Sequence, residues 1–153
     1  MKATWIIWAS LDTLTLTGMF LKHTVNGQII GAVTGAWIVA ALALKYGESG
    51  WTKTDKLCLK IGVVSLIAMV LFPVVGILTS LTAVFVGSFP TFQSAWKDPS
   101  QEDKLAWTIF WTSCLCSVAA IPQWTWGDAA QPLTFFLIET IMVYILYIKP
   151  RHK

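Results

Sequence analysis

The sequence predicts an all-α, polytopic membrane protein with six transmembrane helices in a single domain over residues 1–153. Hydrophobic residues make up 56% of the chain and charged residues only 12%, about half the charged share of a typical soluble domain. Long apolar segments recur along the whole chain, and lysines and arginines cluster between alternate segments. We therefore expect a helical bundle in the lipid bilayer of the cell membrane, with both termini in the cytoplasm.

Four segments have the length and apolarity of single spans, which need about 17–25 helical residues. They are residues 4–21, 29–46, 104–121 and 131–148. The remaining run, residues 57–96, is too long for one span and contains Phe72, Pro73 and Gly76 near its middle. Because proline and glycine interrupt helices, this run predicts two short helices joined by a tight turn near Pro73.

The basic residues indicate an orientation, because cytoplasmic loops collect lysine and arginine. In a six-helix topology, ten of the 11 lysines and arginines lie on the side of both termini, and Lys22 alone lies opposite. A single crossing over residues 57–96 would divide them five against six. The distribution therefore favours six spans with both termini inside.

Several functional classes are not supported by any motif. His23 and His152 stand apart, and the three cysteines lie in apolar segments without the spacing of a metal site. The sequence has no glycine-rich phosphate loop and no recognisable catalytic triad. The net charge of +3 reflects lysines at helix ends. We expect no metal, no cofactor and no nucleic-acid partner.

The chain also pairs with itself at an offset of 103 residues, with six identities over 48 positions, among them Trp8 with Trp111 and Gln28 with Gln131. Both helix pairs have a tryptophan-rich start, a short exported loop and a glutamine near the start of the second helix. This organisation predicts parallel repeats. Residues 1–46 would form an incomplete first unit, 57–72 a linker helix and 74–148 a complete unit of three helices.

The segment Gly87-Ser-Phe-Pro-Thr-Phe-Gln-Ser-Ala-Trp-Lys-Asp-Pro-Ser100 has a proline late in a helix, followed by a polar loop. It resembles a PQ-loop repeat, although Thr91 stands where those repeats usually have glutamine. The helix order resembles the 3+1+3 plan of the SWEET and PQ-loop transporter superfamily, shared by PnuC-type vitamin transporters, without its first helix (2+1+3). This resemblance implies a transporter fold. Two explanations of the missing helix stay open: a partner chain supplies it, or Met1 is an internal start of a longer protein.

Two acidic residues are candidates for solute binding. Asp12 and Glu139 each lie near the centre of a predicted span, where an ionised carboxylate costs several kcal/mol unless it faces water or a partner. Such a residue could bind a cation, relay a proton or accept hydrogen bonds from a polar solute. The alternative is a protonated carboxyl that hydrogen-bonds between helices.

Tryptophans accompany these acids. Trp5, Trp8 and Asp12 fall on one face of a helix, and Trp111 is the repeat equivalent of Trp8. Indole rings stack on sugars, nucleosides and other flat rings, with packing inside the bundle as the equal alternative for Trp8 and Trp111. Trp5 and Trp107, near helix ends, favour the interfacial belt.

Other candidates are weaker. Ser113 and Gln131 could donate hydrogen bonds to a solute or accept them from it. A serine bonded to its own helix and an ordinary hydrated helix end are the more common explanations. Pro90 is a candidate hinge, with a simple kink as the alternative. Three glycines recur every four residues and predict a face for close helix packing: Gly27, Gly31 and Gly35.

These features favour a membrane transporter for a small polar or ring-containing solute, such as a sugar, nucleoside or vitamin-like compound, bound near the bilayer midplane between two helical units. The expected binding residues are Asp12, Glu139, Trp8, Trp111, Ser113 and Gln131. The alternative is a non-transporting membrane subunit whose open groove binds a partner helix or a second copy. An intramembrane enzyme has only the two acids in its favour, and we do not expect one.

Overall fold

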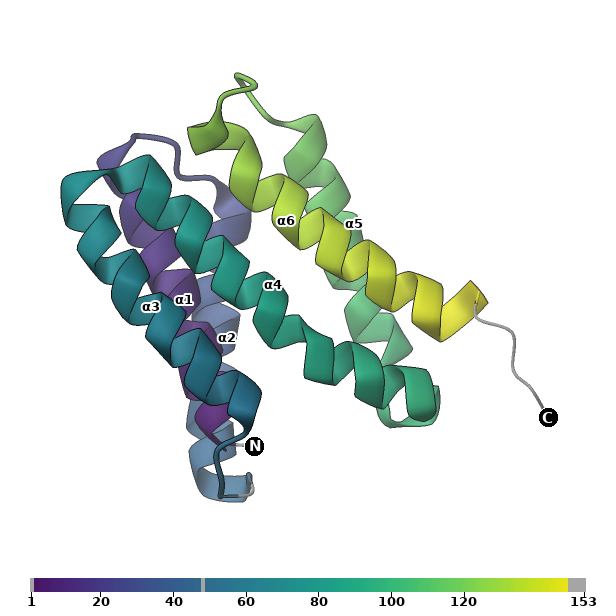
Figure 1. The fold of residues 1–153 in the computed structure, drawn as a ribbon. Coiled ribbons are helices and arrows are strands. Elements are labelled where there is room, and N and C mark those ends of the chain that lie inside the picture. The colour runs from purple at the N-terminus through teal and green to yellow at the C-terminus, as the bar shows by residue number, and fades with distance from the viewer. Residues whose placement is uncertain (1, 48, 149–153) are drawn as a thin grey trace.

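The computed structural model describes residues 2–47 and 49–148, and this part of the chain consists of helices joined by short connections, without strands (Figure 1). The helices are α1 (Lys2–Leu21), α2 (Gly27–Tyr46), α3 (Lys53–Leu71), α4 (Pro73–Lys97), α5 (Lys104–Ala119) and α6 (Trp126–Val143). A 3-10 turn at Pro99–Gln101 precedes α5, and a π-helical turn at Tyr144–Ile148 continues α6. The predicted all-α class and the order of six helices are confirmed.

Three of the helical segments are long and apolar enough to cross a membrane, namely Gly27–Tyr46, Pro73–Lys97 and Trp126–Ile148. The helix α5 has 16 residues and is therefore about 24 Å long at 1.5 Å per residue, shorter than the hydrocarbon core of about 30 Å. The three apolar segments indicate a membrane protein.

The predicted break near Pro73 is confirmed, but the prediction of two short helices is wrong. Phe72 separates α3 from α4, Pro73 is the first residue of α4, and the two helices have 19 and 25 residues. The helix α3 begins before residue 57 because Thr52 and Asp55 form a capping box: Thr52 Oγ1 accepts a 2.9 Å hydrogen bond from Asp55 N, and Asp55 Oδ2 accepts one of 2.8 Å from Thr52 N. Such a cap satisfies backbone donors at the helix start.

The helix α6 also begins earlier than predicted, at Trp126 instead of residue 131. Thr125 is its N-cap, with Oγ1 accepting from the backbone N–H of Asp128 at 3.3 Å. As a consequence, Gln131 lies inside the helix and not at its start.

The helix α4 lies at the centre of the helix contacts in the bundle. It contacts α3, α1 and α6, whereas α2 packs mainly on α1, and α5 mainly on α6. Figure 1 shows α1, α2 and α3 on one side of α4, and α5 and α6 on the other. The helix α6 contacts both α4 and α5 and so lies between them. We call α1–α3 the first helix group and α4–α6 the second.

Close packing joins α3, α1 and α4. A Cβ atom added to Gly76 would lie 2.6 Å from the Cα atom of Met69, so the α3–α4 hairpin requires glycine there. One helical turn further along α4, the hydroxyls of Thr15 and Ser80 lie 2.8 Å apart, and both side chains are fully buried. This hydrogen bond connects α1 to α4 inside the core.

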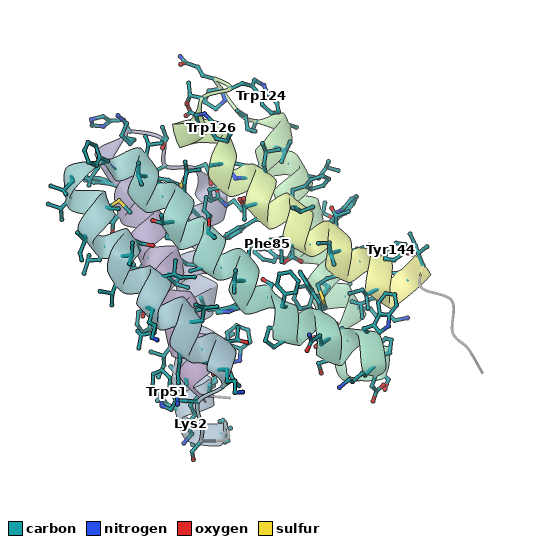
Figure 2. The ribbon with its side chains drawn as sticks, in the orientation of Figure 1. Lys2, Trp51, Phe85, Trp124, Trp126 and Tyr144 are labelled. Atoms are coloured by element: carbon teal, nitrogen blue, oxygen red, sulfur yellow. The ribbon has the colours of Figure 1, made fainter. Side chains whose placement is uncertain are left out.

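The connections alternate between two ends of the bundle. The α1–α2 loop, the break at Phe72 and the α5–α6 loop lie at one end, here called the Phe72 end, and the α2–α3 and α4–α5 connections lie at the other, the Trp51 end (Figure 1). Figure 2 shows Trp124 and Trp126 at the Phe72 end and Lys2 and Trp51 at the opposite end.

Candidate functional site

A cavity of about 580 Å³ lies between the two helix groups. We call it the central cavity. It is lined by Trp5, Trp8 and Asp12 of α1, Gly31, Ala32, Gly35, Ala36 and Val39 of α2, Val84 and Ser88 of α4, Glu102 and Asp103 of the α4–α5 connection, Ala106, Trp107 and Phe110 of α5, and Phe135, Ile138 and Glu139 of α6. Both helix groups therefore contribute to one cavity, which reaches the Trp51 end at Glu102 and Asp103.

Both acidic residues predicted from the sequence line this cavity. Asp12 is 7% exposed and Glu139 is 2% exposed, although they lie 127 positions apart in the sequence. One oxygen of each carboxyl, Oδ1 of Asp12 and Oε2 of Glu139, is buried and has no hydrogen-bond partner. The fold thus brings two incompletely bonded carboxyl groups to a single cavity.

Trp8 belongs to the same cluster. Its Nε1 is the third buried side-chain polar atom that lacks a hydrogen-bond partner in the described part of the chain. Because folded proteins leave few buried polar groups unpaired, it is significant that all three such atoms belong to residues that line one cavity. The Trp8 ring meets the Trp5 ring edge to face, with 5.7 Å between centroids, and Gly87 of α4 leaves room for it.

Trp111 does not line the central cavity. Its Nε1 donates a 3.0 Å hydrogen bond to Thr140 Oγ1 of α6, and its ring lies 6.0 Å from that of Phe136. Trp107, one helical turn earlier, lines the cavity instead and donates from Nε1 to Glu102 Oε2 at 2.9 Å. Trp111 therefore does not share a cavity with Trp8, because it packs on α6. Trp5 and Trp107, expected in the interfacial belt, both line it.

The glycine-rich face of α2 also differs from expectation. Nothing lies within 4 Å of a Cβ atom added to Gly27, Gly31 or Gly35, so no helix of the described chain packs closely there. Gly31 and Gly35 line the central cavity. These glycines provide open volume opposite the aromatic side chains, a role that spacing alone does not distinguish from helix packing.

Gln131 lies outside the central cavity, in a second polar cluster nearer the Phe72 end. Its Oε1 accepts from Asn26 Nδ2 at 2.9 Å, and its Nε2 donates to Gln28 Oε1 at 2.9 Å. Gln28 Nε2 in turn donates to Cys114 Sγ at 2.7 Å. We call Asn26, Gln28, Cys114 and Gln131 the glutamine cluster. Gln131 is fully buried, so the hydrated helix end expected for it is wrong, since α6 extends a full turn before it.

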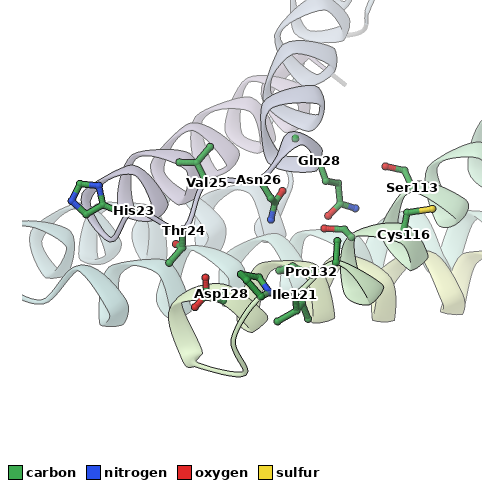
Figure 3. Close-up of a pocket in the computed structure, with 14 residues that line it drawn as sticks. His23, Thr24, Val25, Asn26, Gln28, Ser113, Cys116, Ile121, Asp128 and Pro132 are labelled. Atoms are coloured by element: carbon green, nitrogen blue, oxygen red, sulfur yellow. The ribbon is translucent and has the colours of Figure 1, made fainter.

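Ser113 lines neither of these sites. It is exposed and lies at a hollow of about 460 Å³ at the Phe72 end, together with residues such as His23, Cys116 and Asp128 (Figure 3). Gln28 and Asn26 border the same hollow. The glutamine cluster therefore lies beside this outer hollow and is made by α2, α5 and α6.

Pro90 lies within α4, which continues to Lys97, and its role as a hinge stays a prediction. The described residues contain no group of three or more His, Cys, Asp or Glu side chains that could hold a metal ion. The chemistry that the central cavity offers is hydrogen-bond acceptance by carboxyl groups and stacking on aromatic rings.

Comparison with known proteins assigns no family: no protein-family model, curated protein or solved structure matches this chain.

Proposed function

We propose that this chain is a membrane carrier whose small solute binds in the central cavity. The observation that carries the proposal is that all three unpartnered buried polar atoms of the described chain, in Trp8, Asp12 and Glu139, belong to residues lining that cavity. Its volume of about 580 Å³ lies within the range of small-molecule sites, about 300–1,000 Å³. A cavity used only for packing has no reason to collect unpaired polar atoms.

The proposed topology has six spans, with the Trp51 end in the cytoplasm. Each of the six helices runs between the two ends (Figure 1), and α1 and α3, with 20 and 19 residues, match the length of α2. The lysine and arginine distribution supplies the orientation. In this arrangement Asp12, in the middle of α1, lies near the bilayer midplane, where carriers bind their solutes.

The two ends of the cavity suggest how access would alternate. The central cavity reaches the Trp51 end at Glu102 and Asp103, whereas the glutamine cluster links α2, α5 and α6 toward the Phe72 end. Opening the Phe72 end requires the hydrogen bonds of Gln131 and Gln28 to be exchanged for water. Pro90 of α4 is the proposed hinge, since α4 contacts both helix groups.

Equivalent positions of the proposed repeat meet in this cluster. Gln28 and Gln131 are separated by 103 residues and hydrogen-bond to each other, which is the offset at which the sequence pairs with itself. Two units that face each other across an internal axis would bring equivalent side chains together in this way. The contact supports a carrier built from an incomplete and a complete helical unit.

Uptake into reconstituted vesicles tests the proposal. Proteoliposomes containing the full chain are incubated with labelled glucose, uridine and tyramine, which represent a sugar, a nucleoside and a ring-bearing amine. We expect saturable uptake of at least one solute, loss of that uptake in Asp12→Asn and Glu139→Gln, and retention in Trp111→Phe, whose indole lies outside the cavity. Uptake of all three equal to that of empty vesicles, or unchanged uptake in both acid variants, would contradict the proposal.

One observation favours a second function, a non-transporting subunit that binds a partner helix. The face of α2 that carries Gly27, Gly31 and Gly35 has no close neighbour, and small residues allow a helix to approach. Native mass spectrometry of the detergent-solubilised protein distinguishes the two functions. Saturable uptake by preparations that contain only the monomer would exclude the need for a partner, whereas a stable complex without any uptake would favour the subunit.

A further inference from the structure

We propose that the solute of the central cavity is an organic cation, a ring-bearing amine whose N–H groups bind Asp12 and Glu139 and whose rings pack against the cavity tryptophans. This inference rests on the proposed function and narrows its substrate class. Sugars, nucleosides and anions of similar size are the classes it excludes.

The sign of the charge follows from the residues around the cavity. Four of them carry carboxyl groups, Asp12, Glu102, Asp103 and Glu139, and among the described residues that line it none is a lysine, arginine or histidine. Lining groups of one sign in a low-dielectric cleft concentrate ions of the opposite sign. An anionic solute would meet repulsion from every charged group in the cavity, while a cation would meet only attraction.

The two acids at the Trp51 end already have partners. Asp103 caps α5, with Oδ1 accepting from the backbone N–H groups of Leu105 and Ala106 at 2.9 and 3.0 Å, and Glu102 accepts from Trp107. They therefore guide a cation toward the cavity without themselves requiring a ligand. Asp12 and Glu139 differ, because each retains a buried oxygen without a donor.

A neutral solute would satisfy those oxygens only in part. Hydroxyl groups can donate to a carboxyl group, but with a neutral solute the two buried acids would stay protonated, because unpaired charge inside a membrane protein is expensive. Ammonium N–H groups supply both the donors and the opposite charge, and hydrogen bonds between charged partners are about twice as strong as neutral ones. Two carboxyl groups around one cavity therefore favour a protonated amine over a sugar.

The aromatic lining fits the rest of such a solute. Trp5, Trp8 and Trp107 line the cavity with Phe110 and Phe135, and the Phe110 and Phe135 rings lie 6.2 Å apart between centroids. Tryptophan is the best aromatic partner of a cation placed over its ring face. The same rings cover the apolar part of the solute, while the open surface of Gly31 and Gly35 leaves room for it.

Matched ligands test the charge preference directly. Tyramine, tyrosol and 4-hydroxyphenylacetate share a ring and differ in charge, as do tryptamine, tryptophol and indole-3-acetate. Binding of all six to the purified full chain in detergent is measured by isothermal titration calorimetry. We expect each amine to bind at least about tenfold more tightly than its alcohol, the ratio expected from one charge-assisted hydrogen bond, and neither acid to bind. An alcohol or an acid that binds as tightly as its amine, or failure of both amines to bind, would overturn the proposal.

Variants then identify the groups responsible. Asp12→Asn and Glu139→Gln keep the side-chain shape and should each weaken tyramine binding about tenfold or more, while tyrosol binding weakens less. Trimethylation of the tyramine nitrogen removes its N–H donors but not its charge. It should weaken binding in the wild type but not in a variant that carries both Asp12→Asn and Glu139→Gln. Unchanged tyramine binding in both single variants would show that the acids do not bind the amine.

Failure of this inference is distinguishable from failure of the carrier function. If the amines bind with the expected charge preference but do not enter proteoliposomes, the cation site stands and the carrier does not. If a neutral solute such as uridine is carried and its uptake depends on Trp8, while neither amine binds, the carrier stands and the cation does not.

Discussion

The central cavity and the glutamine cluster lie between the same two helix groups, yet their polar atoms are bonded very differently. In the glutamine cluster the amides of Asn26, Gln28 and Gln131 form a continuous series of hydrogen bonds that ends at Cys114. Around the central cavity, atoms of Trp8, Asp12 and Glu139 have no partner. The proposed solute site therefore rests on missing hydrogen-bond partners around a cavity, and not on the burial of polar residues alone.

The difference follows from the path of α2. At its N-terminal end Asn26 caps the helix, with Oδ1 accepting from Ile29 N at 3.0 Å, and α2 lies close enough to α5 and α6 for side chains to bond. Further along, Gly31 and Gly35 have no neighbour within 4 Å of an added Cβ. Hydrogen-bonded amides thus close the interface between the helix groups near the Phe72 end. Further along α2, small residues leave this interface open.

The largest effect is expected from Gln131→Leu. It removes two hydrogen bonds and leaves half-buried amide groups of Asn26 and Gln28 unpaired, so the free energy of unfolding should fall by about 2–4 kcal/mol. Unfolding in mixed detergent and denaturant, followed by circular dichroism, measures this.

Glu139→Gln is the matched control for that change. It removes a buried carboxyl that lacks one partner, so the free energy of unfolding should stay within about 1 kcal/mol of the wild type or rise. Equal destabilisation by both substitutions would contradict the proposed difference in hydrogen bonding between the glutamine cluster and the central cavity.

A smaller effect is expected where α4 packs on α3. Gly76→Ala brings a methyl group within 2.6 Å of the Met69 Cα atom and should cost about 1–3 kcal/mol of stability, as overpacked cores do. Gly35→Leu should be stable, because the leucine enters open volume, but it should abolish solute binding. Thermal unfolding and calorimetry of both variants compare the two glycines, and a strong loss of stability in Gly35→Leu would show that the cavity is closed.

Trp8 and Trp111, which the proposed repeat pairs, offer a finer comparison. Trp111→Phe removes the hydrogen bond to Thr140 and should lower the free energy of unfolding by about 0.5–1.5 kcal/mol without changing amine affinity. Trp8→Phe removes a donor that has no partner, so it should lower affinity severalfold with a smaller loss of stability. Similar behaviour of the two variants in both measurements would argue that both positions have one role.

The smallest effect is expected from chemical labelling of the wild-type protein, without any substitution. Cys114 is fully buried in the glutamine cluster, whereas Cys116 is exposed beside the outer hollow. A membrane-impermeant maleimide added from the outside should label Cys116 and not Cys114, as mass spectrometry of peptides would show. Labelling of Cys116 only from the cytoplasmic side would reverse the proposed orientation, and rapid labelling of Cys114 would show that the cluster leaves the Phe72 end open.

Helix order followed from the sequence because it depends on local properties. Apolar segments of sufficient length and Pro73 in the middle of the longest one predict six helices and the break between α3 and α4. The grouping of Trp8 with Asp12 was predictable for the same reason, since side chains four residues apart share one helix face. Neither inference needed knowledge of distant contacts.

The rest of the site depends on how distant helices pack. Which tryptophan of α5 faces the cavity is decided by α6, which lies between α4 and α5 and takes Trp111 as its neighbour. The spacing of Gly31 and Gly35 is the same whether a helix or a cavity lies opposite. The burial of Gln131 followed from a cap at Thr125, six residues before the predicted start of the helix. That cap was readable in the sequence, because Thr125 and Asp128 have the spacing of a helix start.

Gly87 has a consequence for how such a protein could diversify. A Cβ atom there would lie 2.8 Å from Trp8 Nε1 and 3.4 Å from Cys58 Sγ, so even alanine would push the indole toward the central cavity. Gly87 itself does not line that cavity. Evolution could therefore narrow or widen ligand selectivity by exchanging one small residue on α4 while every group in contact with the ligand stays the same.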